Sequence, residues 1–214
     1  MELELWLLYW FMLGLSPHNK RLLYSVTANW PDAQEAVLAE LTALDWQYTS
    51  GFEQRARVET HDQHSTALDN TYYLKRMVED VRAQQTNLLT YMYSNEEFSK
   101  HIWPGTTLEQ LLANTSTVCE LYRDNPGWRT GVHIDHRAAV ATGMLFFEPK
   151  NDKNKSTYFY TTEKRTDEQR MSCAYATGWY AANTHRSWHT GGNMGRDLRY
   201  SLLFASFLRL GTHH

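Results

Sequence analysis

Apolar and polar positions change their pattern near residue 115. Before it, apolar residues recur three and four apart, which is typical of amphipathic helices. A helix start at residues 29–32 (Asn-Trp-Pro-Asp) precedes such a pattern, and further helices are predicted over residues 69–93 and 107–113. Residues 46–68 are ambiguous and are compatible with a strand. The first half is therefore expected to be mainly helical.

From residue 117 the chain consists of short runs rich in β-branched and aromatic residues, separated by turn formers. The turn sequence Asp-Asn-Pro-Gly at 124–127 predicts that the segments around it, 118–122 and 131–135, are paired strands. Further strands are predicted over residues 139–148, 157–161, 174–181 and 200–208. The polar stretches 149–155 and 162–171 are predicted loops. Short strands at this spacing indicate a β-sandwich or barrel.

Length and charge narrow the possible functions. A chain of 214 residues is long enough for one sizeable core, so a single domain is expected, with residues 1–115 as a helical supporting region and 116–210 as the β-rich core. The net charge of −3 and the lack of a dense Lys/Arg run give no signal for nucleic acid or for an anionic membrane.

Two features bear on location. The most apolar stretch, residues 5–15, is too short to span a bilayer as a helix and is preceded by Glu2 and Glu4. It is expected to be a buried element or a contact surface. Cys119 and Cys173 are too few for a disulfide framework, which favours a reducing, cytoplasmic setting.

A possible metal site begins with His133 and Asp135. On a strand, residues two apart project to the same side, so both side chains would point at one ion. The pair alone is also compatible with an ordinary surface pair. A third ligand from a distant segment would complete two imidazoles and one carboxylate, a set that suits Fe(II). His189 is the preferred candidate, and His185 is its competitor.

Arg199 and Ser201 suggest an acid-binding site beside the metal. Two apart on a predicted strand, a guanidinium and a hydroxyl would face the same side and could grip one carboxylate. Alone, the pair would be read as a solvated arginine and a filler residue. Ten positions after His189, it fits a site that holds both iron and an organic acid.

These residues together resemble the Fe(II)- and 2-oxoglutarate-dependent dioxygenases, whose pattern is His-x-Asp, a distal His, and Arg-x-Ser about ten residues later. The match covers residues 117–210 through His133, Asp135, His189, Arg199 and Ser201. The resemblance implies an α+β fold, a double-stranded β-helix (jelly roll, cupin-like) with packed N-terminal helices. It also implies Fe(II), 2-oxoglutarate as co-substrate and O₂. Tyr122 is similar to a tyrosine that often contacts the co-substrate in that family.

The resemblance implies a hydroxylase that couples decarboxylation of 2-oxoglutarate to oxidation of a substrate C–H bond. A small molecule or amino acid and a peptidyl side chain are both open as substrate. Four residues near the metal motif and the distal histidine are candidate substrate contacts: Arg129, Arg137, Asn183 and Trp188. Two alternatives also stay open, a cupin-like metal protein or dioxygenase that does not use 2-oxoglutarate, and a non-catalytic binding module.

Overall fold

The structure is a computed structural model. The structure describes these residues: 23–27, 34–49, 52–60, 66–94, 96, 99–100, 103–136, 138–147, 157–160, 171–173, 178–182, 188–191 and 194–209. The apolar segment 5–15, the predicted loop 149–155 and residues 162–170 lie outside them.

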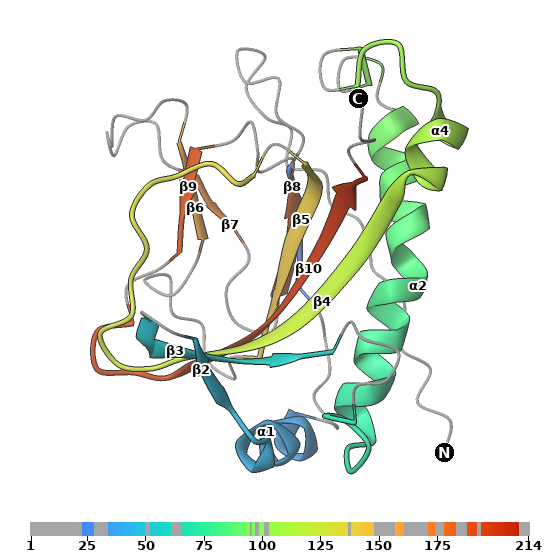
Figure 1. The fold of residues 1–214 in the computed structure, drawn as a ribbon. Coiled ribbons are helices and arrows are strands. Elements are labelled where there is room, and N and C mark those ends of the chain that lie inside the picture. Colours follow the sequence, from blue (N-terminus) through green and yellow to red (C-terminus); the bar gives the residue numbers. More distant parts are fainter. Residues whose placement is uncertain are drawn as a thin grey trace.

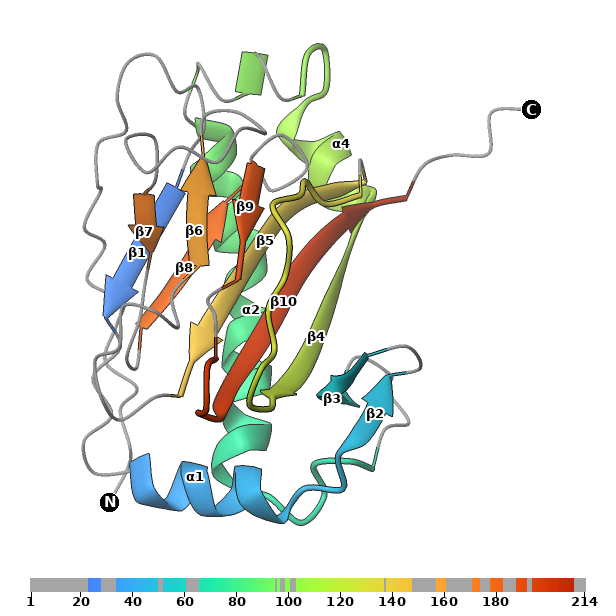
Figure 2. The same ribbon diagram turned by 90° about the vertical axis from the view of Figure 1, so that its left-hand side faces the viewer.

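Two antiparallel sheets form the framework (Figure 1). The large sheet has seven strands, in the order β1 (Leu23–Thr27), β8 (Gly178–Ala182), β5 (Ala139–Phe146), β10 (Arg199–Leu208), β4 (Thr115–Asp124), β3 (Phe52–Glu59) and β2 (Gln47–Thr49). The small sheet has the order β7 (Met171–Cys173), β6 (Thr157–Tyr160) and β9 (Trp188–Thr190). Figures 1 and 2 show the small sheet stacked on one face of the large one.

Helices cover the other face of the large sheet. The longest is α2 (Tyr73–Ser94), which runs behind β5 and β10 in Figure 2, while α1 (Gln34–Ala43) and α4 (Leu108–Ala113) lie near its two ends. The main chain at the start of α2 is held by Glu40 of α1, whose carboxylate accepts hydrogen bonds from the N–H groups of Tyr72, Tyr73 and Leu74. A carboxylate there satisfies N–H groups that have no partner within the helix.

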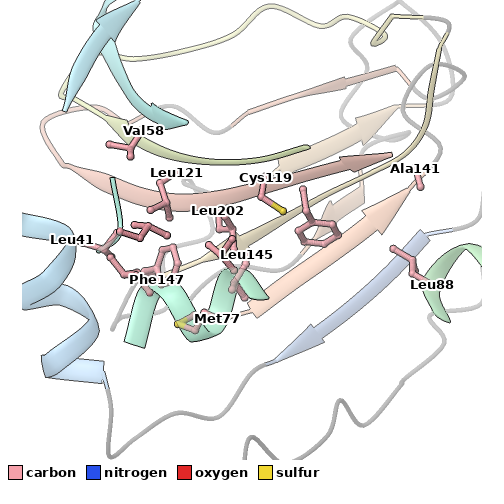
Figure 3. Close-up of a cluster of buried hydrophobic side chains, with 14 of the residues drawn as sticks. Leu41, Val58, Met77, Leu88, Cys119, Leu121, Ala141, Leu145, Phe147 and Leu202 are labelled. Atoms are coloured by element: carbon pink, nitrogen blue, oxygen red, sulfur yellow. The ribbon is translucent and has the colours of Figure 1, made fainter. Parts of the chain in front are cut away.

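Periodicity explains the core between the helices and the sheet. The predicted apolar stripe of α2 is buried, as Leu74, Val78 and Leu88 show. It meets the alternate residues of β4 and β10 that face the helix, among them Leu121 and Leu202 (Figure 3). The opposite alternate residues of the same strands face the small sheet. One face of the large sheet therefore packs into the hydrophobic core, and the other face can carry the side chains of a functional site.

The structure confirms most of the predicted elements, with shifted ends. The predicted helix 69–93 begins at Tyr73, because residues 67–70 form a turn, and the ambiguous segment 46–68 contains β2 and β3. Three strands before residue 115, β1 to β3, join the large sheet, so the early part of the chain contributes strands as well as helices. Among the described residues, no helix is both long and apolar enough to cross a bilayer.

One predicted strand is wrong. Residues 131–135 do not pair with β4, since β4 pairs with β10 along one edge and with β3 along the other, and both of its edges are therefore used. The segment instead makes a single bridge, His133 to His189. Figure 1 shows the chain after β4 running back beside β9 before it enters β5. β9 itself is a strand where a connection between strands was expected.

Candidate metal and acid-binding site

Two imidazoles and one carboxylate converge at the edge of the small sheet. Potential ligand atoms of His133, Asp135 and His189 all lie within 4.8 Å of one another. Asp135 Oδ1 is 3.6 Å from His133 Nε2 and 3.7 Å from His189 Nε2. Both separations are shorter than twice a bond of roughly 2.1 Å, so one first-row metal ion can bond to each of these pairs of atoms.

The main chain brings the two histidines together. His133 N donates to His189 O at 2.9 Å, and His189 N donates to His133 O at 2.8 Å. Residues directly opposite in an antiparallel bridge carry their side chains on the same face. The imidazole ring centroids are accordingly 4.3 Å apart. This bridge, and not a strand over residues 131–135, is what aims His133 at the site.

Hydrogen bonding selects the nitrogen of His133 that can bind a metal. Its Nδ1 lies 2.9 Å from the carbonyl oxygen of Gly131. Since a carbonyl only accepts, Nδ1 carries the proton and Nε2 is left with its lone pair, on the side of Asp135. A backbone carbonyl behind a ligating histidine is a common arrangement at metal sites.

The three side chains differ in exposure. His189 is buried, at 7% exposed, and its ring stacks on Phe159 of β6 with a centroid distance of 5.6 Å. Phe159 is the residue paired with His189 across the small sheet. The side chains of His133 and Asp135 are 44% and 27% exposed. The cluster therefore has an apolar wall on one side and can be reached by solvent on the other.

A second group of charged residues lies on the face of the large sheet opposite the helices. Arg199, at the start of β10, is 1% exposed and stands directly across from Asp124, the last residue of β4. Its Nε and Nη2 donate to Asp124 Oδ2 at 3.0 and 2.6 Å. Arg55 of β3 approaches the same carboxylate from the other side, donating from Nε to Oδ1 at 2.5 Å and from Nη2 to Oδ2 at 3.0 Å.

Charge is unevenly balanced in this group. Burial alone would raise the pKa of Asp124, but the positive charges of Arg199 and Arg55 and their hydrogen bonds bring it below its ordinary value. The carboxylate therefore stays ionised at neutral pH. Two guanidinium groups on one carboxylate leave an excess of positive charge, which suits the binding of an anion.

Ser201 lies beside these charges. It faces the same side of β10 as Arg199 and pairs in register with Tyr122 on β4 and Phe146 on β5. Its side chain is fully buried, and its Oγ has no hydrogen-bond partner in the part of the chain that the structure describes. Leaving a buried hydroxyl unsatisfied costs roughly 1–3 kcal/mol. A bound carboxylate would satisfy it.

Tyr122 has a partner of its own. Its hydroxyl donates to the carboxylate of Glu120, which also lies 3.6 Å from Arg57. Burial, followed by the negative charge of Glu120, raises the pKa of Tyr122 well above its ordinary value. The hydroxyl is therefore protonated at neutral pH, and it contacts a co-substrate only if it gives up Glu120.

The candidate substrate residues are only partly placed. Arg129 is exposed in the loop after β4, and Trp188 opens β9 and is half-buried. Arg137 and Asn183 lie outside the described residues, as does His185, the competitor of His189. The structure thus brings His133, Asp135 and His189 together, and it places Arg199, Ser201 and Tyr122 on one face of the large sheet.

Sequence reasoning missed three residues of this region. Asp124 looked like the first residue of a turn, Arg55 lay in the ambiguous segment, and Thr130 carried no signal. Thr130 fastens the loop before His133 to the end of β9: its Oγ1 accepts from Gly191 N at 2.7 Å, and its carbonyl accepts from Thr190 Oγ1 at 2.5 Å. No sequence signal separated Asp124 from an ordinary turn residue, because it directly precedes Asn-Pro-Gly.

At the sequence level, no protein-family model and no curated protein matches this chain. The structure does resemble solved structures. A prolyl-4-hydroxylase from Pseudomonas putida aligns over 87% of this chain and 92% of its own, with a TM-score of 0.54 and 13% identity. A prolyl hydroxylase from Trichoplax adhaerens, solved with a peptide fragment of the hypoxia inducible factor oxygen degradation domain, aligns over 86% and 83%, with a TM-score of 0.55 and 10% identity.

A third neighbour is the epimerase SnoN from nogalamycin biosynthesis, solved with Fe³⁺, alpha-ketoglutarate and nogalamycin RO. It aligns over 86% of this chain and 78% of its own, with a TM-score of 0.51 and 10% identity. Identities this low describe the fold alone, and the neighbours include both hydroxylases and an epimerase. With its two stacked antiparallel sheets and helix-covered outer face, the chain has the fold of the Fe(II)- and 2-oxoglutarate-dependent oxygenases.

Proposed function

We propose that this protein is a non-haem Fe(II)- and 2-oxoglutarate-dependent dioxygenase that hydroxylates its substrate. The observation that carries the proposal is the convergence of His133, Asp135 and His189, from two distant segments, on one point. Two neutral imidazoles and one carboxylate are the ligand set of non-haem Fe(II) oxygenases, and they leave coordination positions open. The proposal includes a single oxygenase domain whose two sheets form a jelly roll.

The residues around the cluster fit this assignment. His133 and His189 would bind the metal through nitrogen, and Asp135 would supply the negative charge. Bound Fe(II), 2-oxoglutarate and O₂ supply oxidative decarboxylation to succinate and CO₂, coupled to oxidation of a substrate C–H bond. The chain's own part is to hold these groups: the apolar side of Phe159 limits water on one flank, and the exposed sides of His133 and Asp135 leave access for a substrate.

Co-substrate binding is assigned to Arg199 and Ser201, with Tyr122 as a further contact. The buried Ser201 hydroxyl, which has no partner among the described residues, supports this, as does the excess of positive charge around Asp124. The substrate is a small molecule, an amino acid or a peptidyl side chain. Residues 129, 137, 183 and 188 are proposed as its contacts because they flank the metal motif and the distal histidine in sequence.

One observation favours a second candidate, a cupin-like metal protein that does not use 2-oxoglutarate. The Nε–Nη2 edge of Arg199 already faces a carboxylate, that of Asp124, and a ligand would have to bind the guanidinium elsewhere or displace it. The two candidates make opposite predictions for binding of 2-oxoglutarate by the metal-loaded protein.

The deciding experiment is anaerobic addition of Fe(II) and then 2-oxoglutarate. A visible charge-transfer band that needs both additions is expected, and an Asp135→Asn variant should lose it. Succinate release in air, with amino acids, peptides and nucleosides added in turn, would then identify the substrate class by the component that raises the uncoupled rate. Well-folded protein that binds Fe(II) but gives no band with 2-oxoglutarate would favour the cupin-like alternative.

A further inference from the structure

Arg55 has no counterpart in the motif by which the site was found, yet it makes two hydrogen bonds to Asp124. Its guanidinium carbon also lies over two aromatic rings, 4.5 Å from the centroid of Tyr122 and 4.4 Å from that of Trp128. Such contacts between a cation and a ring fix the guanidinium plane as well as its charge. This degree of fixation is more than an exposed surface ion pair has.

Asp124 would weaken anion binding if Arg199 were its only partner. A buried pair of one guanidinium and one carboxylate has no net charge, and a second carboxylate brought up to Arg199 would be repelled by Asp124. Arg55 removes this difficulty because it neutralises Asp124 with two hydrogen bonds, one to each oxygen. Arg55 and Arg199 together bring two positive charges to the single negative charge of Asp124.

We propose that Arg55 is a positioning residue whose charge balances Asp124, so that Arg199 can bind the far carboxylate of a dicarboxylate co-substrate. The inference rests on the proposed function, since it concerns the acid-binding part of that site. The charged residues involved are Arg55, Asp124 and Arg199, which lie on three neighbouring strands of the large sheet. Asp124 fixes the orientation of both guanidiniums. Arg55 offsets the negative charge of Asp124, which would otherwise repel the carboxylate of the ligand.

The test is a charge-swap cycle read out by binding. Protein loaded with Mn(II), a redox-stable stand-in, is titrated with 2-oxoglutarate, and separately with pyruvate, which is a 2-oxo acid without the second carboxylate. In Arg55→Gln the 2-oxoglutarate affinity is expected to fall about tenfold or more, as the loss of one nearby charge in a poorly solvated site implies. Pyruvate affinity should change little, which separates the far carboxylate from the metal end.

Two further variants make the result specific to charge. Arg55→Lys keeps the charge but not the fork, and should bind 2-oxoglutarate within about threefold of the wild type. The double variant Arg55→Gln/Asp124→Asn restores the excess positive charge on Arg199 and should recover most of the affinity lost in Arg55→Gln. Arg55→Lys keeps the inference testable if the double variant, which leaves the buried Arg199 without the Asp124 carboxylate, proves unstable.

Arg123→Gln is the matched control. Arg123 is next to Asp124 in sequence but faces the other side of the sheet, where its Nη2 donates to Tyr48 Oη at 2.9 Å. Removing this charge should leave 2-oxoglutarate affinity unchanged. Thermal unfolding and Mn(II) affinity are measured for each variant to confirm that the fold and the metal cluster are intact.

The inference is overturned if Arg55→Gln binds 2-oxoglutarate as the wild type does, if pyruvate affinity falls equally, or if the double variant is no better than Arg55→Gln. Each of these outcomes differs from failure of the proposed function, in which the wild-type protein itself binds Mn(II) without binding 2-oxoglutarate. The inference is supported if Arg55→Gln loses affinity for 2-oxoglutarate but not for pyruvate, and if the double variant recovers the 2-oxoglutarate affinity.

Discussion

His133 and His189 exchange both of their main-chain hydrogen bonds, at 2.9 and 2.8 Å, and thereby carry two imidazoles to the same point from distant parts of the chain. Neither bond depends on an imidazole. A mutation that truncates either histidine side chain should therefore remove a metal ligand and leave the main-chain bridge in place.

Replacing His133 by alanine should abolish tight metal binding and leave the fold unchanged. Loss of one ligand of three is expected to cost at least the roughly 10–100-fold in affinity that loss of an outer-shell partner costs at metal sites. Anaerobic titration with Fe(II) or Co(II) measures it. His136→Ala is the control, since His136 is exposed and lies outside the cluster. Equal metal affinity in His133→Ala and the wild type would contradict the assignment.

The buried Asp124 should make stability depend on pH. Its pKa in the folded protein is below the unfolded value of about 3.9, so its ion pairs contribute fully above that pH and are lost as the pH falls below it. Asp124→Asn should therefore be less stable than the wild type by about 3–5 kcal/mol near neutral pH, as expected for breaking a buried ion pair. The difference should shrink below about pH 4.

Urea unfolding across this pH range measures that difference. Asp69→Asn is the control, because Asp69 is 57% exposed and its ion-pair partner among the described residues, Lys75, lies 3.9 Å away. Its effect should stay below about 1 kcal/mol, as for other exposed pairs. A destabilisation of Asp124→Asn that is the same at acidic and neutral pH would show that the carboxylate charge is not what stabilises the fold.

A side chain at Gly191 should push against Thr130. A Cβ there would lie 3.1 Å from Thr130 Oγ1 and 3.6 Å from Arg199 Nη2. The first distance requires Thr130 to move, and Thr130 holds the loop before His133 to Gly191 N. Gly191→Ala is expected to lower the free energy of unfolding by about 1 kcal/mol, typical of mild overpacking. It should weaken metal binding too.

Gly131→Ala is the matched variant, because a Cβ at Gly131 meets no atom of the described residues within 4 Å. Both substitutions lie two residues from a histidine of the cluster, so a difference between them reports the contact with Thr130 and not the mere loss of a glycine. Chemical denaturation and a metal titration of the two proteins side by side decide it. Equal behaviour of the two variants would count against a role for Thr130 in holding the loop.

The sequence allowed the metal cluster to be predicted because a short local motif and a distal histidine at a fixed distance from Arg199 carry the signal. The prediction that strand alternation points His133 and Asp135 to the same side was wrong, because residues 131–135 form no regular strand. The bridge to His189 orients His133 instead. Strand pairing between distant segments is decided by which edges remain open, and hydrophobic periodicity does not report that.

In the acid-binding region, too, the sequence does not show which distant strands lie side by side. Arg199 and Ser201 share a face as alternation predicts, and the burial of both follows from β10 lying between β4 and β5. Asp124 and Arg55 could not be predicted as their neighbours. Asp before Asn-Pro-Gly is as typical of a turn as of a strand end, and only the register of β3, β4 and β10 places one carboxylate between two guanidiniums.

Cys119 should be chemically inert in the folded protein. It is fully buried on the helix-facing side of β4, and burial raises the pKa of its thiol to about 11. Because the thiolate is the reactive form, alkylation by iodoacetamide near pH 8 should be about a hundredfold or more slower in native than in urea-unfolded protein. A Cys173→Ser background lets mass spectrometry count Cys119 alone. Native and unfolded proteins reacting at similar rates would mean that β4 opens readily from α2, and that the core between them is not the stable part of the fold.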